Sequence, residues 1–269
     1  MRRYRDVVFV SLPIITIALI LIPTLLGAIG PLPPIDVRDL AKTYLYFTLD
    51  IYNKSLWAAS PEAVTAIVWD YRGLDTFYET IVFYTAIIGC LALYREVVRK
   101  PDRSKGEGLS IVVKKATAIA MLGIVAVGAS TVLHGMLTPG GGFQGGSIIA
   151  VAPVLAIVVF SRILVDYSKI TYEKAIMLRN LSIIGIALTA LAPLIISLGN
   201  AFIFQNQVKA YTTFSYPSSI LDVFMGGSLW FLNLFEGIAV SMAFFIAFKV
   251  LLYTEETSKE VLIGEDYGY

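Results

Sequence analysis

Six apolar runs, each about as long as a membrane-spanning helix, divide this sequence of 269 residues. About 20 apolar residues in a helix cross the hydrocarbon core of a bilayer, so each run predicts one transmembrane helix. The predicted spans are 7–29, 77–94, 116–133, 147–165, 181–204 and 228–252. The pattern therefore predicts an all-α fold, a polytopic membrane helical bundle with about six transmembrane helices.

Lys and Arg are distributed unevenly between the segments that join these spans. If the N-terminus lies inside, 16 of the 21 basic residues fall on the inner side and five on the outer side. Cytoplasmic segments carry the excess of Lys and Arg, so we predict a multi-pass protein of the cell membrane whose N- and C-termini are cytoplasmic.

The first run follows three arginines, as a signal peptide does, but its 23 residues are too long for the apolar region of a signal peptide, and no A-x-A cleavage site follows it. We therefore expect an uncleaved anchor.

Cysteine labelling tests this topology. In a Cys90→Ser background, Ser55→Cys and Ser104→Cys should react with a membrane-impermeant thiol reagent from opposite faces, because the basic segment that contains Ser104 is predicted to lie inside. Labelling of both positions from one face would contradict the six-span arrangement.

The charge and composition pattern divides the chain into four parts. We predict a two-span part at 1–100 with an outer loop at 30–74, a basic cytoplasmic linker at 101–115, a four-span part at 116–253 and an acidic tail at 254–269.

In the outer loop, Val37, Leu40, Tyr44, Leu45 and Ile51 recur at helical spacing and predict a helix on the membrane surface or on a partner. Ser60-Pro61-Glu62 predicts the N-cap and first turn of a second short helix.

Composition excludes several functional classes. Hydrophobic residues make up 57 % of the chain and charged residues 15 %, whereas about a quarter of a soluble chain is charged. The net charge of +1 gives no basic field for nucleic acid. One cysteine (Cys90) and one histidine (His134) exclude a disulfide framework, a Cys-based metal or iron–sulfur site and di-histidine ligation within this chain. A soluble enzyme and a redox carrier are therefore poor interpretations.

A charged segment leads into the second predicted span. Asp75 and Glu79 are four residues apart and would share one face of a helix, and Arg72 precedes Asp75 by one turn. Two acids and a base at a membrane mouth are typical of a charged relay or an ion vestibule. A salt-bridge network that anchors the helix end is the structural alternative.

A glycine-rich turn joins the third and fourth predicted spans, shortly after His134. Its motif residues are Pro139, Gly140, Gly141, Gly142, Phe143, Gln144, Gly145 and Gly146. The spacing of the glycines lets two membrane helices touch, and the motif lacks the features of a P-loop or a dinucleotide site. The backbone N–H groups could hold an anion or water, but a tight re-entrant turn is the favoured interpretation. His134 is either a hydrogen-bonded residue at a helix end or a proton carrier.

The last predicted span contains two polar residues on one helical face, Asn233 and Glu236. Glu236 lies eight residues from the start of the span, a depth of about 12 Å at 1.5 Å per residue. A lone carboxylate at such a depth costs a few kcal/mol, so we expect Glu236 to bind a proton or a cation, or to pair with a group in this chain or in another subunit.

The segment Thr138-Pro139-Gly140-Gly141-Gly142-Phe143-Gln144-Gly145-Gly146 resembles the motif of the MnhB/MrpB-like subunit of Mrp-type multisubunit sodium/proton antiporters. It is more similar still to the counterpart in archaeal membrane-bound hydrogenase and sulfur-reductase complexes, which tend to have the glutamine. Asp70-Tyr71-Arg72-Gly73-Leu74-Asp75-Thr76 with Glu79 is similar to a segment at the C-terminal end of the MrpA-like antiporter subunit, or in a small separate subunit of the hydrogenase-type complexes. The family usually has a histidine three residues before the proline, where this chain has Met136. Together the two resemblances imply a fusion of neighbouring subunits.

This resemblance implies a non-catalytic membrane subunit of a cation (Na⁺)/proton antiporter module, the ion-translocating membrane arm of a hydrogenase-like complex. It implies no metal and no cofactor in this chain. It implies as partners the lipid bilayer, the other Mrp-like antiporter subunits (A/D-, C-, E-, F- and G-like) and, in the redox-driven branch, a peripheral nickel–iron hydrogenase-like module. The ion-relay candidates are Glu236, Glu79, Asp75, Asn233 and His134. The alternatives are a non-conducting structural scaffold and a self-sufficient carrier, which should show inverted repeats.

Overall fold

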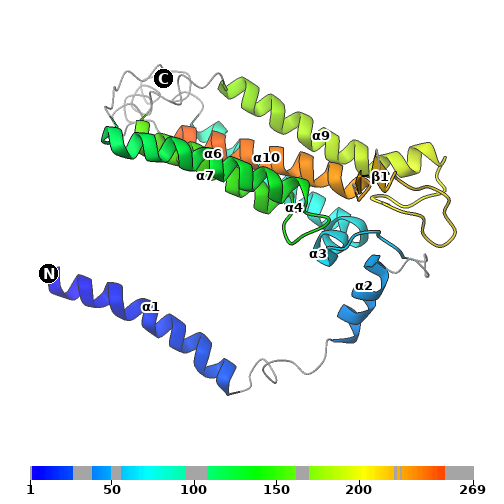
Figure 1. Cartoon of the computed structure of the whole chain (residues 1–269), viewed down its shortest axis with the longest axis horizontal. Helices are drawn as coiled ribbons and strands as arrows, with labels where there is room; N and C mark the ends of the chain where they lie inside the picture. Colours follow the sequence, from blue (N-terminus) through cyan, green and yellow to red (C-terminus); the bar gives the residue numbers. More distant parts are fainter. Residues whose placement is uncertain are drawn as a thin grey trace, which may run out of the picture. The chain divides into compact units, whose positions relative to one another are not determined.

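Figure 1 shows the computed structural model of the chain, coloured along the sequence. The structure describes residues 2–26, 38–49, 56–94, 108–161, 170–220, 223–224 and 226–251. The chain forms two compact units, residues 1–43 and residues 44–269.

The first unit contains helix α1 (Arg2–Leu25) and the beginning of helix α2 (Asp39–Leu49). Helix α1 contains most of the first predicted span, and its part Ile14–Leu25 is a short apolar helix by composition. Helix α2 confirms the helix that the apolar spacing in the outer loop predicts.

Among its described residues, the second unit contains five helices that are long and apolar enough to cross a membrane. These are α4 (Gly73–Leu93), α6 (Ile111–Leu133), α7 (Gly142–Phe160), α9 (Tyr172–Ile196) and α10 (Ser228–Val250). The chain is therefore a multi-pass helical membrane protein, as predicted. Ser55 and Ser104 lie outside the described residues, and the orientation of the termini stays a prediction.

The ends of several helices differ from the sequence-based expectation. Helix α7 begins at Gly142, inside the predicted glycine-rich turn and before the predicted start of its span at residue 147. The fifth span was predicted at 181–204, but α9 runs from Tyr172 to Ile196. The hydroxyl of Thr171 caps the N-terminus of α9 by accepting a hydrogen bond from Lys174 N at 3.4 Å, so the helix includes polar residues that an apolar count leaves out. Similarly, α6 begins at Ile111, inside the predicted linker 101–115.

The short helix of the outer loop begins at a different residue from the one predicted. Helix α3 (Ala63–Thr65) continues as the π-helix η1 (Ala66–Tyr71), and Glu62 rather than Ser60 is its N-cap. The Glu62 carboxylate accepts hydrogen bonds from the N–H groups of Val64 and Thr65. Ser60 is unavailable as a cap because its hydroxyl donates to the carbonyl of Met136 at 2.9 Å. The prediction of Ser60 as the cap was wrong because a long-range contact takes its side chain.

Helix α10 lies at the centre of the bundle (Figure 1). It packs against α7, α9 and α4, and α7 also packs against α6. In the most apolar stretch of α10, 56 % of the residues are buried, against 17–33 % in the other four spans. Many large apolar side chains on the outer faces of α4, α6 and α9 are exposed, as expected where the solvent is lipid.

The glycine motif supplies the close helix contacts. A Cβ atom at Gly145 would meet Val132 and the carbonyl of Gly128 on α6, and one at Gly146 would lie 2.6 Å from the carbonyl of Gly237 on α10. Helix α7 therefore packs backbone to backbone against helices on two sides, which is the arrangement that small-xxx-small spacing permits.

The loop between α9 and α10 contains the described strands of the chain, β1 (Ser219–Ile220) and β2 (Val223–Phe224). They pair antiparallel, with Ser219 opposite Phe224 and Ile220 opposite Val223. This two-residue hairpin is a small addition to an otherwise helical fold.

Candidate functional site

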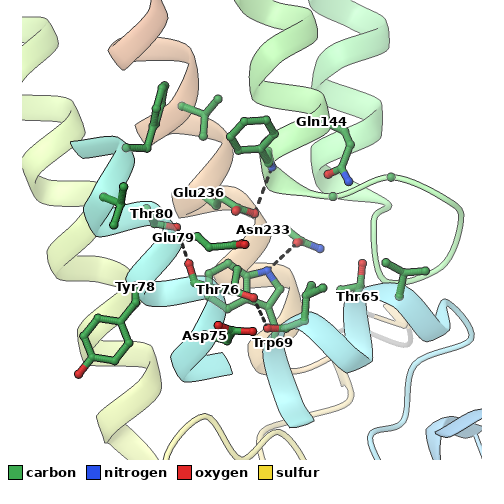
Figure 2. A pocket seen from close by; sticks show the side chains of 18 of the residues that line it. Thr65, Trp69, Asp75, Thr76, Tyr78, Glu79, Thr80, Gln144, Asn233 and Glu236 are labelled. Atoms are coloured by element: carbon green, nitrogen blue, oxygen red, sulfur yellow. Dashed lines mark hydrogen bonds between the residues drawn. The ribbon is translucent and has the colours of Figure 1, made fainter. Parts of the chain in front are cut away.

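The three polar features of the sequence meet at one pocket of about 820 Å³ in the second unit. Figure 2 shows its side chains. Eight of its lining residues are among those singled out in the sequence: Asp75, Glu79, Gly140, Gly141, Phe143, Gln144, Asn233 and Glu236. The hydroxyl-bearing side chains of Thr65, Thr76, Tyr78 and Thr80 also line it. Segments more than 150 residues apart in the sequence thus contribute to one site.

Glu236 is held by the N-terminus of α7. Only 7 % of Glu236 is exposed, and its Oε2 accepts a hydrogen bond from the N–H of Phe143 at 3.1 Å (Figure 2). The N–H groups at the start of a helix have no partners within the helix, and the helix dipole there favours negative charge. The glycine motif therefore contacts the carboxyl group of Glu236 on α10 through the N-terminus of α7.

Asn233 lies one turn before Glu236 and joins three elements. Its Oδ1 accepts hydrogen bonds from the N–H of Gly142 at 3.3 Å and from the indole Nε1–H of Trp69 at 3.2 Å. These two donors fix the orientation of the amide, and its Nδ2 has no hydrogen-bond partner in the part of the chain that the structure describes. Asn233 thus fixes the position of α7 relative to α10 and η1.

The π-helix η1 positions Trp69. Its wider turn frees backbone carbonyls, and the carbonyl of Val68 accepts a hydrogen bond from the hydroxyl of Thr76 at 2.5 Å. Trp69 is fully buried and stacks on Phe204, with ring centroids 5.9 Å apart. Short π-helical segments occur often at functional sites, and this one aims an indole N–H at the polar centre of the pocket.

Glu79 and Asp75 enter the pocket from α4 (Figure 2). Glu79 is exposed at the pocket edge, and its carboxylate is close enough to that of Glu236 for the two to interact electrostatically. Asp75 forms an ion pair with Arg72, with both side chains more than half exposed. Two carboxylates near each other in a partly dry pocket repel, which favours a bound proton or cation between them.

His134 is the one relay candidate that the structure places outside the pocket lining. It is exposed at the C-terminal end of α6, where its Nδ1 lies 3.2 Å from the carbonyl of Ser130. This position agrees with the interpretation of His134 as a hydrogen-bonded residue at a helix end.

The family model for domains related to the MnhB subunit of Na⁺/H⁺ antiporters matches residues 112–246, half of the chain. This chain belongs to that MnhB-related family. The match contains the glycine motif, Asn233 and Glu236. It begins after α4, so the predicted likeness of the preceding segment to an MrpA-like subunit stays a prediction.

Three similar proteins extend the comparison. An uncharacterised protein of Methanocaldococcus jannaschii, MJ1307, is 28 % identical over 200 residues, covering 67 % of this chain and 72 % of the relative. A chain of the membrane-bound sulfane sulfur reductase, an archaeal respiratory membrane complex, superimposes with a TM-score of 0.66 and 27 % identity over 91 % of this chain and 98 % of its own. A chain of the Mrp complex from Dietzia sp. DQ12-45-1b gives a TM-score of 0.62 and 16 % identity, over 94 % of this chain and 26 % of its own length. The last likeness shows a shared fold alone.

A buried ion pair that sequence reasoning missed joins Lys209, inside the MnhB-related region, to Asp70, which precedes that region. Asp70 of η1 pairs with Lys209 of the loop before α10, and the two side chains are 0 % and 6 % exposed. Asp70 is part of the charged motif quoted above, but the sequence offers no signal that a lysine 139 residues later folds back onto it.

Burial sets the protonation properties of this pair. Loss of hydration raises the pKa of the Asp70 carboxyl above its ordinary value, against the opposing effect of Lys209. Loss of hydration also lowers the pKa of the Lys209 ammonium, against the attraction of Asp70. Each charge is therefore stabilised by its partner, and the pair behaves as one unit.

The chemistry of the pocket is that of carboxylates, amides and hydroxyls. In the described part of the chain, no group of three or more His, Cys, Asp or Glu side chains is arranged to hold a metal ion. The arrangement can take up and release a proton, or hold a hydrated cation between Glu79 and Glu236.

Proposed function

We propose that this chain is a non-catalytic membrane subunit of an Mrp-type cation/proton antiporter module, within a larger respiratory or antiporter complex. Its pocket forms part of the ion path, with Glu236 and Glu79 as the groups that exchange a proton or a cation. Membership of the MnhB-related family supports the antiporter context, and the likeness to the sulfane sulfur reductase chain supports a membrane arm of a redox-driven complex.

The observation that carries the proposal is the buried carboxylate of Glu236 at the wall of an open pocket. A membrane-embedded acid is costly, and the structure gives Glu236 one backbone donor at Oε2 with no ion-paired cation among the described residues. The Glu79 carboxylate approaches from the facing helix. An acid that served only to anchor a neighbour would be expected to meet a basic side chain.

The partners follow from the same proposal. The other subunits of the antiporter module would cover the exposed apolar faces of the bundle, and a peripheral redox module would supply the driving force in a hydrogenase-like complex. The chain then contributes ion binding rather than catalysis.

Substitution of the two pocket acids tests the proposal in the intact complex. Glu236→Gln and Glu79→Gln keep shape and hydrogen bonding but cannot release a proton. For Glu236→Gln, we expect normal assembly with ion transport lowered about a hundredfold, the order lost when a proton-transferring side chain is removed. Transport is measured as sodium-dependent pH change in vesicles, and assembly by co-purification of the subunits.

The matched control is Glu173→Gln, an exposed acid on α9 outside the pocket, which should leave transport unchanged. Wild-type transport in both pocket variants with normal assembly would contradict the ion path and favour the scaffold alternative. Failed assembly of Glu236→Gln would instead identify Glu236 as a structural contact to another subunit.

A further inference from the structure

One wall of the pocket presents hydrogen-bond donors. The first two N–H groups of α7 both point at α10, that of Gly142 at Oδ1 of Asn233 and that of Phe143 at the carboxyl group described above. The amide of Asn233 cannot turn round, because Gly142 and the indole of Trp69 both need its oxygen. Its Nδ2, in a side chain that lines the pocket and is 1 % exposed, is therefore a donor without a partner among the described residues. This donor wall, formed by Phe143, Asn233 and Glu236, also carries the positive end of the α7 dipole.

The facing wall, on α4, presents oxygen atoms. Thr76 and Thr80 are 9 % and 7 % exposed and line the pocket together with Glu79; their spacing places all three on one face of the helix. The hydroxyl of Thr76 donates to the carbonyl of Val68, and that of Thr80 donates to the carbonyl of Thr76 at 3.0 Å. A hydroxyl that gives its hydrogen to a carbonyl keeps its lone pairs. This acceptor wall, formed by Thr76, Glu79 and Thr80, therefore offers two hydroxyl oxygens and a carboxylate (Figure 2).

A metal cation and a proton make different demands on these walls. A metal cation leaves water where several oxygen atoms replace its hydration shell, which the acceptor wall provides. A proton needs one oxygen with a free lone pair, and Glu236 can take it on Oε1 while Oε2 keeps the hydrogen bond from Phe143. Among the described residues, Asp75 is the other acid that lines the pocket, and its ion pair with Arg72 leaves Glu79 as the carboxylate for a cation.

We propose that the two walls bind different ions: Glu236 takes the proton, and Glu79 with the hydroxyl oxygens of Thr76 and Thr80 takes the metal cation. The two carboxylates interact electrostatically across the pocket, so a proton on Glu236 removes a negative charge that attracts the cation. By reciprocity, a cation at Glu79 weakens the binding of the proton at Glu236. Such coupling is what exchange of one ion for the other requires. The inference rests on the proposed function, because it takes the pocket to be part of an ion path.

Two kinds of exchange, measured on the same vesicles, separate the two ions. The intact complex is reconstituted with equal sodium concentrations inside and outside, and sodium-for-sodium exchange is followed with radioactive sodium. This exchange moves no proton. Sodium–proton exchange is followed with an internal pH dye. For Glu236→Gln we expect sodium–proton exchange to fall about a hundredfold, the order lost with a proton-transferring side chain, and sodium-for-sodium exchange to stay within about twofold of the wild type.

Removal of one hydroxyl tests the acceptor wall. Thr80→Val keeps the shape of the side chain but removes an oxygen ligand, so we expect the half-saturating sodium concentration to rise about tenfold, the order of loss when a group that supports a metal site is removed. The matched control is Thr85→Val. Thr85 is exposed on the same helix outside the pocket lining, and its hydroxyl donates to the carbonyl of Ile81 at 2.9 Å in the same way. An unchanged concentration for Thr80→Val, or an equal rise for Thr85→Val, would refute the assignment of the cation to this wall.

The outcomes for Glu236→Gln distinguish this inference from the proposed function. Equal loss of both kinds of exchange would overturn the inference, since Glu236 would then hold the metal cation, and would leave the proposed ion path standing. Failed assembly would overturn it as well, because Glu236 would then be a structural contact to another subunit. Wild-type exchange of both kinds in Glu236→Gln and in Glu79→Gln would contradict the proposed function itself, and the inference with it.

Discussion

Replacement of Gly145 by leucine is expected to prevent assembly of the bundle. A Cβ atom at Gly145 would lie 2.6 Å from the carbonyl oxygen of Gly128 and 2.8 Å from the backbone nitrogen of Val132, both on α6. Neither backbone atom can turn aside, so α6 and α7 must separate. Overpacking of a tight contact costs about 1–3 kcal/mol or more, and leucine adds three further carbon atoms beyond the Cβ. We expect the amount of assembled complex to fall to background on gel filtration in mild detergent.

The same helices offer matched controls. A Cβ atom at Gly123 of α6 or at Gly89 of α4 would meet nothing within 4 Å. Gly123→Leu and Gly89→Leu add the same side chain to open helix faces, where surface changes stay within about 0.5 kcal/mol. Wild-type yield of Gly145→Leu, or equal loss in the Gly123→Leu control, would refute close backbone packing as the function of the motif.

The position of five of the six predicted spans followed from the sequence, because a bilayer imposes one simple requirement on a spanning helix, its apolar length. Each of the five helices that the structure describes as long and apolar enough to span a membrane overlaps one predicted span. The helix ends were less predictable, because they depend on polar groups rather than on the apolar run. The hydroxyl of Thr171 caps the N-terminus of α9 before the apolar run begins. The hydroxyl of Ser60 does not cap the short helix, because it donates to the carbonyl of Met136.

The sequence indicated which residues line the candidate site but not which of them contact one another. Intramembrane polar residues and a glycine motif are visible as outliers in an apolar sequence, and all eight predicted residues named above line the pocket. That the N–H of Phe143 would bind Glu236, 93 residues away, requires knowledge of how α7 and α10 pack. The indole of Trp69 was missed because a tryptophan in an apolar segment is ordinarily a packing residue.

The buried pair Asp70–Lys209 provides the second large expected effect. The Asp70 carboxylate also accepts the N–H of Asn206 at 2.9 Å, and the Lys209 ammonium also donates to the carbonyl of Trp57 at 2.8 Å. The pair therefore ties the segment before α3, the π-helix η1 and the loop before α10 into one unit. Because η1 carries Trp69, loosening this unit should also displace the indole from Asn233 in the pocket.

Removal of either partner leaves a buried charge alone. We expect Lys209→Met to lower the free energy of unfolding by about 3–5 kcal/mol, the usual cost of breaking a buried ion pair. Asp70→Asn should cost less, because Lys209 keeps its carbonyl acceptors at Leu56 and Trp57. The measurement is unfolding in a denaturing-detergent titration, with tryptophan fluorescence as the probe.

The double variant Asp70→Asn Lys209→Met decides whether the charges act as a pair. With both charges removed, no ion is left buried, so the loss should be smaller than the sum of the single losses by about 1–3 kcal/mol, the coupling expected of residues in direct contact. The exposed pair Arg72–Asp75 is the matched control, since ion pairs on the surface contribute about 0–1 kcal/mol and the same cycle there should show little coupling. Additive losses at Asp70 and Lys209 would mean that each residue stabilises the fold through its backbone contacts alone, and the geometry of Trp69 would then not depend on the ion pair.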